Sequence, residues 1–242
     1  MLLKFAYDGT KFYGYQRQVD LPTVEGEILK VLKKYEISNE IKSASRTDRG
    51  VSALGNVIKV STDEDPDKVI GILNSNLHHI FFRGYSMNEA NPRFAKLRWY
   101  RYHLPDFGYS IQDLRESAKI FQGEHDFRNF TKAKKNTVLN IEEIKVEKRN
   151  GIYIIDFRAR YYLWNMIRRI VAAMSSYASG NYFDENVFEK RVNFGVAPPE
   201  PLILMDVIYD FPFTMRKLRP REKNWFFKRF SAGLVYYYLF EE

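Results

Sequence analysis

The sequence has no cysteine, which excludes disulfide bonds and thiolate-based catalytic or metal sites. It has no run of about 18 apolar residues, the length that a helix needs to cross a bilayer, so we expect no membrane-spanning segment. The chain begins with a strand-like stretch at residues 2–7 rather than a basic and then apolar leader. These absences are consistent with a cytoplasmic protein.

Histidine is also scarce, with four residues in 242. His78 and His79 are the only adjacent pair of histidines, but neighbouring side chains rarely point at one ion. We therefore expect an ordinary loop at this position and no metal site.

Basic and aromatic residues are abundant. Lysine and arginine number 38 against 30 acidic residues, giving a net charge of +8, and there are 17 Tyr and 19 Phe. A basic surface with aromatic planes is typical of proteins that bind phosphates and stack bases. Aromatic residues also fill cores, and a basic protein can instead bind an acidic protein or a membrane surface.

Local patterns predict helices that begin after Thr23, Asp65, Ser110 and Asp184, and another over residues 163–174. Asn150-Gly151 predicts a β-hairpin between residues 139–149 and 152–161. We interpret the chain as two α+β halves, residues 1–95 and 96–212, that share one sheet and a cleft. The extension 213–242 is basic and then aromatic, and we expect it to pack on the body or on a second subunit.

The most informative segment is residues 43–55, Ser-Ala-Ser-Arg-Thr-Asp-Arg-Gly-Val-Ser-Ala-Leu-Gly. It is small, polar and punctuated by glycine, so it is expected to be a surface loop, where function concentrates. Asp48 is its only carboxylate and lies between Arg46 and Arg49, cations that favour the ionised form. Such a loop can place a nucleophile or base beside a phosphate backbone. The alternative is a plain turn, in which Asp forms local hydrogen bonds and Gly50 supplies a positive φ.

Two further segments contain candidate site residues. If residues 97–104 form a strand, Arg98, Tyr100 and Tyr102 share one face, which is unusual for a core and suitable for a cleft floor. A half-exposed strand explains the same pattern. In the helix over 163–174, Arg168 and Arg169 both lie off the apolar face, and periodicity does not choose between them.

These motifs, taken in order over residues 4–210, resemble the TruA family of tRNA pseudouridine synthases. The matching stretches are Tyr7-Asp8-Gly9-Thr10, Arg46-Thr47-Asp48-x-Gly50-Val51, Arg98-x-Tyr100-x-Tyr102, Trp164-Asn165-Met166-Ile167-Arg168 and Leu202-x-Leu204-x-x-Val207-x-Tyr209. The chain departs from the family pattern at Tyr15, usually Trp, at His78 and Pro201, usually Pro and Gly, and at Ser45, usually Gly. If that last position requires a positive φ, Ser45 is strained there.

The resemblance implies a pseudouridine synthase fold, of α+β class, with two mixed halves, a largely antiparallel sheet and a central basic cleft. It implies that Asp48 starts cleavage of the uridine N-glycosidic bond, by attack on the sugar or by removal of a sugar proton. Tyr100 stacks on the base and can serve in the final proton removal. Arg168 holds Asp48 ionised and aimed, and Arg46 fills the space left by the flipped nucleotide.

The implied substrate is tRNA, at uridines 38–40 of the anticodon arm, and relatives with broader targets exist. Other residues expected to contact RNA are Gln16, Arg49, Arg98, Lys132, Lys134 and Lys135. The resemblance also suggests a homodimer, and no metal or organic cofactor is needed because no redox step or activated water is involved. Two alternatives remain: a non-catalytic RNA-binding protein on the same fold, and a basic protein-interaction module.

Overall fold

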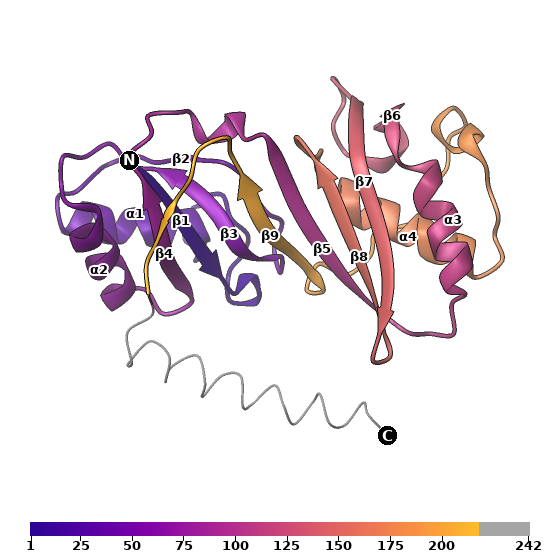
Figure 1. The fold of residues 1–242 in the computed structure, drawn as a ribbon, viewed down its shortest axis with the longest axis horizontal. Helices are drawn as coiled ribbons and strands as arrows, with labels where there is room; N and C mark the ends of the chain where they lie inside the picture. The colour runs from indigo at the N-terminus through magenta and orange to yellow at the C-terminus, as the bar shows by residue number, and fades with distance from the viewer. Residues whose placement is uncertain (218–242) are drawn as a thin grey trace.

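A single mixed sheet extends through the molecule from one end to the other. The computed structural model describes residues 1–217, in which ten strands follow the order β10-β4-β1-β3-β9-β5-β8-β7-β6, with β2 paired to β3 (Figure 1). The strands are β1 (Leu2–Tyr7), β2 (Lys42–Ser43), β3 (Ser52–Lys59), β4 (Ile80–Ser86), β5 (Leu97–Pro105), β6 (Gly123–Asp126), β7 (Val138–Arg149), β8 (Ile152–Ala159), β9 (Leu202–Ile208) and β10 (Thr214–Met215). The pairing of β3 with β9 is parallel, and the other pairings are antiparallel. The expected α+β class with a largely antiparallel sheet is confirmed.

Two helices lie at each end of this sheet. Helices α1 (Val24–Lys34) and α2 (Pro66–Asn76) accompany β1 and β4, whereas α3 (Ile111–Ile120) and α4 (Met166–Ala178) accompany β7 and β8 (Figure 1). The side chains of Thr23, Asp65 and Ser110 accept hydrogen bonds from the first turns of α1, α2 and α3, as their sequence positions predict. These three helix starts are therefore confirmed.

The predicted hairpin is also confirmed. Asn150 and Gly151 join β7 to β8 with φ values of 45° and 68°. Positive φ at both central residues is what a type I′ turn requires, and this turn matches the twist of paired strands.

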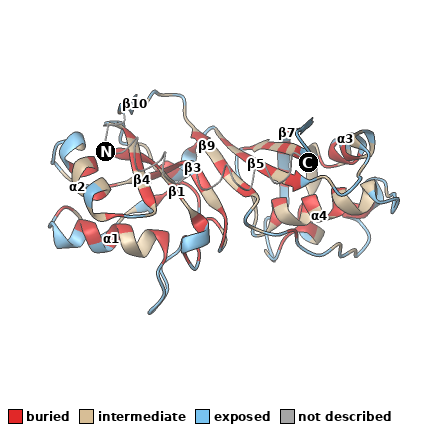
Figure 2. Ribbon diagram, turned by 90° about the horizontal axis from the view of Figure 1, so that it is seen from below, coloured by how far each residue is buried: buried red, intermediate tan, exposed pale blue. Residues whose placement is uncertain are grey.

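Strand β9 connects the two ends of the sheet. It is formed late in the chain, yet it pairs in parallel with β3 and antiparallel with β5. Leu204 and Val207 of β9 are fully buried, and Figure 2 shows buried residues along the strands from one end of the sheet to the other. Because the Asp48 loop leads into β3 and Tyr100 lies on β5, β9 sets the separation of these two candidate site residues.

The prediction of a helix after Asp184 is wrong. The chain there makes only a 3-10 turn, Glu185–Phe188, whose first turn is capped by the Asp184 side chain. The ring of Phe188 stacks on His125 at 4.2 Å between centroids, so aromatic packing rather than a helical stripe holds this segment. This stack also gives His125 a structural role.

The extension that begins at residue 213 starts by packing on the body. Thr214 and Met215 pair with Tyr85 and Gly84 at the edge of β4. The remainder of the predicted extension, residues 218–242, lies outside the described residues. Within residues 1–217, no helix has the length and apolar character to cross a membrane.

Candidate active site

Asp48 and Arg168 form an ion pair between the two ends of the sheet. Asp48 lies on the loop between β2 and β3, and Arg168 lies in the first turn of α4. The Arg168 Nη1 donates to Asp48 Oδ2 at 3.3 Å, and the Arg168 Nε donates to the Ala197 carbonyl at 2.7 Å. The Arg168 side chain is 15% exposed and the Asp48 side chain is 25% exposed, so water only partly screens the ion pair. Arg168, rather than Arg169, is thus the arginine that contacts Asp48.

Asn165 orients Arg168. It precedes α4 with a φ of 60°, in the left-handed region, and its side chain does not cap the helix. Its Oδ1 instead accepts a hydrogen bond from Arg168 Nη1 at 3.2 Å. The guanidinium is therefore held by Asn165 on one side and Ala197 on the other while it faces Asp48. Sequence patterns did not indicate this role, although Asn165 stands within the stretch that leads to Arg168.

A network of buried polar groups holds the Asp48 loop in place. The Tyr7 hydroxyl and Thr47 Oγ1 are 2.8 Å apart, and the Asn56 Nδ2 donates to the Ser45 carbonyl at 3.0 Å. The Tyr15 amide donates to the Thr47 carbonyl at 3.2 Å. Because buried polar groups are costly to leave unpaired, these bonds hold the loop in one conformation. Asp48 is thus presented from a rigid base.

Tyr100 lies on β5 and faces the same cavity as Asp48. Its ring packs edge-on against Tyr162, with centroids 5.3 Å apart and planes at 86°. Burial raises the pKa of Tyr100 to about 12, and the charge of Asp48 adds to the rise, while Arg98 and the Ser45 hydroxyl oppose it. Tyr100 is therefore a neutral phenol at neutral pH, with its oxygen in a polar environment.

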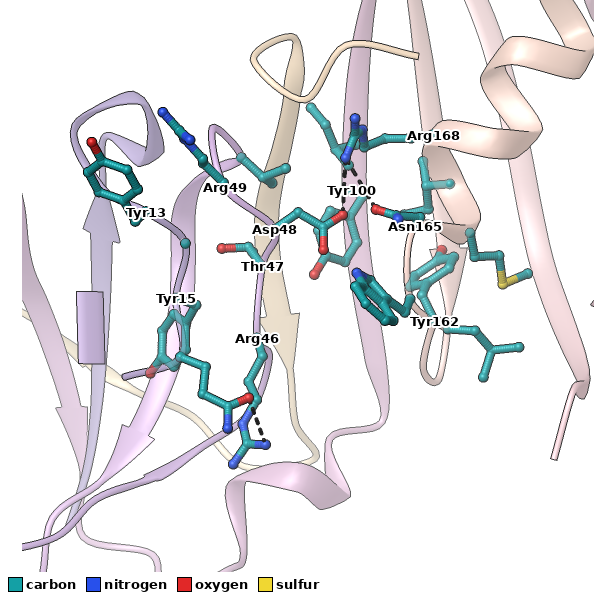
Figure 3. Close-up of a pocket in the computed structure, with 18 of the residues that line it drawn as sticks. Tyr13, Tyr15, Arg46, Thr47, Asp48, Arg49, Tyr100, Tyr162, Asn165 and Arg168 are labelled. Atoms are coloured by element: carbon teal, nitrogen blue, oxygen red, sulfur yellow. Dashed lines mark hydrogen bonds and ion pairs between the residues drawn. The ribbon is translucent and has the colours of Figure 1, made fainter. Parts of the chain in front are cut away.

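Asp48, Arg168 and Tyr100 line one cavity of about 540 Å³, together with Asn165 and Tyr162. Figure 3 shows the Asp48 side chain extending from its loop toward Arg168 and Asn165. A cavity of this size accommodates a planar base. Its carboxylate can act as a nucleophile or base, and its aromatic side chains can stack on a ring. In residues 1–217, no cluster of three or more His, Cys, Asp or Glu side chains is placed to hold a metal ion.

Comparison with known proteins identifies the family. Residues 117–210 match the family model described as tRNA pseudouridine synthase. tRNA pseudouridine synthase A of Pyrococcus furiosus is 40% identical over 220 residues, which cover 86% of this chain and 83% of that protein. The protein of the same name from Pyrococcus horikoshii is 39% identical over 252 residues, covering 98% of this chain and 96% of that protein. The chain belongs to the tRNA pseudouridine synthase family.

Solved structures show a more distant similarity. A Cbf5–Nop10–Gar1 complex superposes with a TM-score of 0.36 at 13% identity, over 71% of this chain and 44% of that chain. An archaeal box H/ACA sRNP Nop10–Cbf5 complex gives a TM-score of 0.37 at 12% identity, over 70% and 44%. The family assignment of this pseudouridine synthase rests on its sequence relatives.

Three of the seven residues predicted to bind RNA line the cavity of the pseudouridine synthase: Gln16, Arg46 and Arg49. Arg46 and Arg49 are exposed and extend from the loop in directions away from Asp48 (Figure 3). The Arg46 Nη1 donates to Gln16 Oε1 at 3.4 Å, and the Arg49 guanidinium lies 4.4 Å from the Tyr13 ring centroid. The Arg49–Tyr13 contact therefore puts a cation beside an aromatic plane at the cavity edge.

A second cation–aromatic pair lies on the α4 side. The Lys132 ammonium is 5.1 Å from the ring centroid of Trp164, which lines the cavity and is 59% exposed. Lys134 and Lys135 follow on the same exposed loop and do not line the cavity. Neither Trp164 nor Tyr13 was predicted as a site residue, although exposed aromatics next to basic residues are a general sign of base stacking.

Arg98 requires a correction, because it was expected to bind RNA. Its side chain is buried, with the residue 6% exposed. Its guanidinium donates to Ser45 Oγ at 3.0 Å, to the carbonyls of Ala44 and Arg93 at 2.8 and 3.0 Å, and to the Arg160 carbonyl. Because four protein acceptors already occupy this guanidinium, Arg98 supports the loop and is not available to a phosphate.

The expected strain at Ser45 is a second point that the structure corrects. It is not among the residues with positive φ, so its backbone does not need glycine and does not bear the strain that a positive φ would impose. The serine side chain instead has partners of its own, Arg98 among them.

Proposed function

We propose that this tRNA pseudouridine synthase isomerises uridines 38–40 in the anticodon arm of tRNA, with Asp48 as the essential carboxylate. Its family membership makes the chain an isomerase of tRNA uridines, and the target positions follow from the resemblance to the TruA family. The observation that supports the role of Asp48 is its pairing with Arg168 at the wall of a cavity that Tyr100 shares.

The proposed reaction begins when Asp48 attacks the sugar or removes a sugar proton, so that the N-glycosidic bond breaks. The freed uracil turns within the cavity and joins C1′ of the sugar through C5. In the first route the bond between Asp48 and C1′ breaks as the C5–C1′ bond forms, and in the second route Asp48 returns the proton to the sugar. In the last step the proton leaves C5, the electrons of that C–H bond re-form the C5=C6 double bond, and N1 takes a proton from solvent. Tyr100 stacks on the base. Its phenol is neutral in most molecules at neutral pH, and its minor ionised form accepts the C5 proton.

The substrate uridine must leave the RNA stack to reach Asp48. Flipping a nucleotide costs a few kcal/mol, which stacking and phosphate contacts offset. We propose that Arg46 fills the vacated space, with Gln16 beside it, and that Arg49, Lys132, Lys134 and Lys135 contact phosphates. Recognition of shape and backbone is typical of proteins that bind folded RNA. A homodimer and a cytoplasmic location are further parts of this proposal, and sedimentation of the purified enzyme tests the first of them.

The decisive experiment uses unmodified tRNA that carries tritium at uracil C5 and compares wild type with Asp48→Asn. Wild type should release tritium and the variant should not, since Asn has no carboxylate to attack or to accept a proton. Release by both proteins would rule out the role of Asp48. Absence of release by either, with tRNA binding intact, would favour a non-catalytic RNA-binding protein.

The target positions need a separate control. The same assay uses a tRNA in which uridines 38–40 are replaced by cytidine and tritium remains at the other uridines. The proposal expects no release from this substrate. Undiminished release would assign the enzyme to other uridines.

A further inference from the structure

A second cavity adjoins the cavity that contains Asp48. Its volume is also about 540 Å³. Five residues line both cavities and so form their border: Asp48, Arg49, Trp164, Asn165 and Arg168. The second cavity is completed by Thr10, Phe12, Gly50, Pro199 and Glu200. The proposed isomerisation takes place in the first cavity and gives the second no occupant.

Trp164 presents an exposed aromatic ring at this border. The residue is 59% exposed, yet its main chain is fixed. The Trp164 carbonyl accepts hydrogen bonds from Thr131 Oγ1 at 3.1 Å and from the Lys132 amide at 3.4 Å, and Thr131 is itself buried. The next residue, Asn165, accepts a hydrogen bond from Arg168. The indole therefore projects from a fixed point, one residue before the side chain that orients Arg168.

The charges around Trp164 favour a base as the occupant of the second cavity. The Lys132 ammonium lies 5.1 Å from the indole centroid, and Arg49 lines both cavities, so cations stand at the border where an RNA backbone passes. Glu200 lines the second cavity itself. A Cβ at Gly50 would lie 3.4 Å from Glu200 Oε1, which places this carboxylate beside the Gly50 backbone. A carboxylate repels a phosphate but accepts hydrogen bonds from the N–H groups at the edge of a base.

The RNA substrate supplies a base that needs such a partner. When a uridine leaves the stack, the bases on either side of it each lose one stacking partner. A neighbouring nucleotide is covalently linked to the flipped uridine, so its base is brought to the border of the first cavity whenever the uridine is bound. An exposed indole offers a plane on which any base can stack.

We propose that the second cavity is a subsite for the base of a nucleotide adjacent to the target uridine, and that this base stacks on Trp164. The inference rests on the proposed function, since it takes the target uridine to lie in the cavity of Asp48. The stack on Trp164 replaces one that the neighbouring base loses on flipping, and it keeps the uridine in the first cavity while the uracil turns.

A double-mutant cycle between enzyme and RNA tests this proposal. Tritium-labelled tRNAs with a single target uridine carry an abasic nucleotide on its 5′ side or on its 3′ side, and each is compared with the intact tRNA. An abasic nucleotide keeps its sugar and phosphate, so it removes only the base. Single-turnover tritium release and tRNA affinity are measured for wild type, Trp164→Ala and Trp164→Phe.

On one of the two sides, loss of the base should cost wild type about 5- to 100-fold more than it costs Trp164→Ala, which is the usual effect of one base–aromatic stack. Trp164→Phe, which keeps an aromatic plane, should retain part of this difference. Phe107→Ala is the matched control and should respond like wild type, because Phe107 is 73% exposed and lines neither cavity.

An equal cost of the abasic nucleotide in wild type and Trp164→Ala, on both sides of the uridine, would overturn the inference. Any loss of activity in Trp164→Ala would then be the same for every substrate, and it would assign Trp164 to the support of Asn165 and Arg168.

Failure of this inference is distinguishable from failure of the proposed function. If wild type releases tritium from intact tRNA, Asp48→Asn does not, and the cycle shows no coupling, only the subsite is wrong. If Asp48→Asn releases tritium like wild type, the catalytic assignment itself is wrong, whatever the cycle shows.

Discussion

At the scale of single residues, the site depends on which of two adjacent arginines faces Asp48. Arg168 contacts Asp48, Asn165 and Ala197, whereas the Arg169 Nε is buried without a hydrogen-bond partner among residues 1–217. The two residues share charge, size and helix, so they form a natural pair of variants.

We expect Arg168→Ala to lower the single-turnover rate by about 100-fold or more, the usual effect of removing one preorganised charged donor from a site. Arg169→Ala should retain nearly the wild-type rate. Tritium release at saturating tRNA gives the rates, and thermal melting checks that both variants are folded. An equal loss in both variants would contradict the assignment of Arg168.

Tyr100 leads to a prediction about pH. Burial raises its pKa to about 12, so between pH 7 and 10 the ionised fraction rises about tenfold for each pH unit. If the ionised oxygen accepts the C5 proton, the isotope-sensitive rate should rise with the same slope. Single-turnover rates with C5-deuterated and ordinary tRNA, measured at several pH values, provide the test. Tyr100→Phe should abolish the slope, and a flat wild-type profile would exclude the ionised phenol.

At the scale of elements, local signals were sufficient for some parts of the fold. The starts of α1, α2 and α3 depend on one capping side chain each, and the β7–β8 turn depends on two residues with positive φ. The central position of β9 could not be predicted from such signals, because it depends on pairing with strands about 100 and 150 residues away in the chain. Asp184 caps a single 3-10 turn and not a longer helix. Aromatic packing of Phe188 determines the path of the chain beyond that turn.

The candidate site was predictable to a similar extent. Resemblance to the TruA motifs selected Asp48, Tyr100 and Arg168, and the structure brings these three residues to one cavity. Alternation along β5 placed Arg98 on the face of Tyr100, but it could not tell a cleft floor from a buried face with four internal acceptors. The network of Ser45 and Asn165 was missed because its partners come from other elements.

Asn165 gives a prediction about the start of α4. Its φ of 60° is comfortable for glycine, whereas for a non-glycine residue without a polar side chain it costs about 1–2 kcal/mol. Asn165→Gly and Asn165→Ala both remove the contact with Arg168, so both should lose activity. Only Asn165→Ala should also melt at a clearly lower temperature. Equal melting temperatures would mean that α4 begins differently, and full activity of Asn165→Gly would remove Asn165 from the positioning of Arg168.

At the scale of the whole molecule, many tyrosines are buried in their neutral form. Burial raises the pKa of Tyr100 and Tyr102 to about 12, and it raises those of Tyr7, Tyr15 and Tyr162 above the ordinary value of 10.0. A folded pKa above the unfolded one means that the folded state binds more protons at high pH. The resulting stability is complete below pH 10 and is lost as pH rises through the folded values.

The enzyme should therefore unfold more easily between pH 10 and 12 than at pH 8. Urea unfolding followed by circular dichroism at several pH values measures this. Tyr15→Phe should reduce the pH dependence, since Tyr15 is fully buried and its hydroxyl donates a hydrogen bond to the Ser43 hydroxyl, a neutral partner. Unchanged stability up to pH 12 would contradict the burial of these phenols.

The net charge of +8 predicts how the enzyme binds tRNA. Each phosphate contact releases counterions, so log affinity should fall with log salt concentration by about 0.7 to 0.9 per contact. Arg49→Ala and Lys132→Ala should each reduce this slope by about one contact, because both cations lie at the cavity edge beside exposed aromatic rings. Lys68→Ala is the control, since Lys68 lies on α2, at one end of the sheet (Figure 1), and forms an ion pair with Glu64, which precedes that helix. Filter binding between 50 and 300 mM salt, roughly the range over which such slopes are resolved, separates these cases. A salt-independent wild-type affinity would mean that phosphates do not bind here, and it would favour a partner other than RNA for the basic surface.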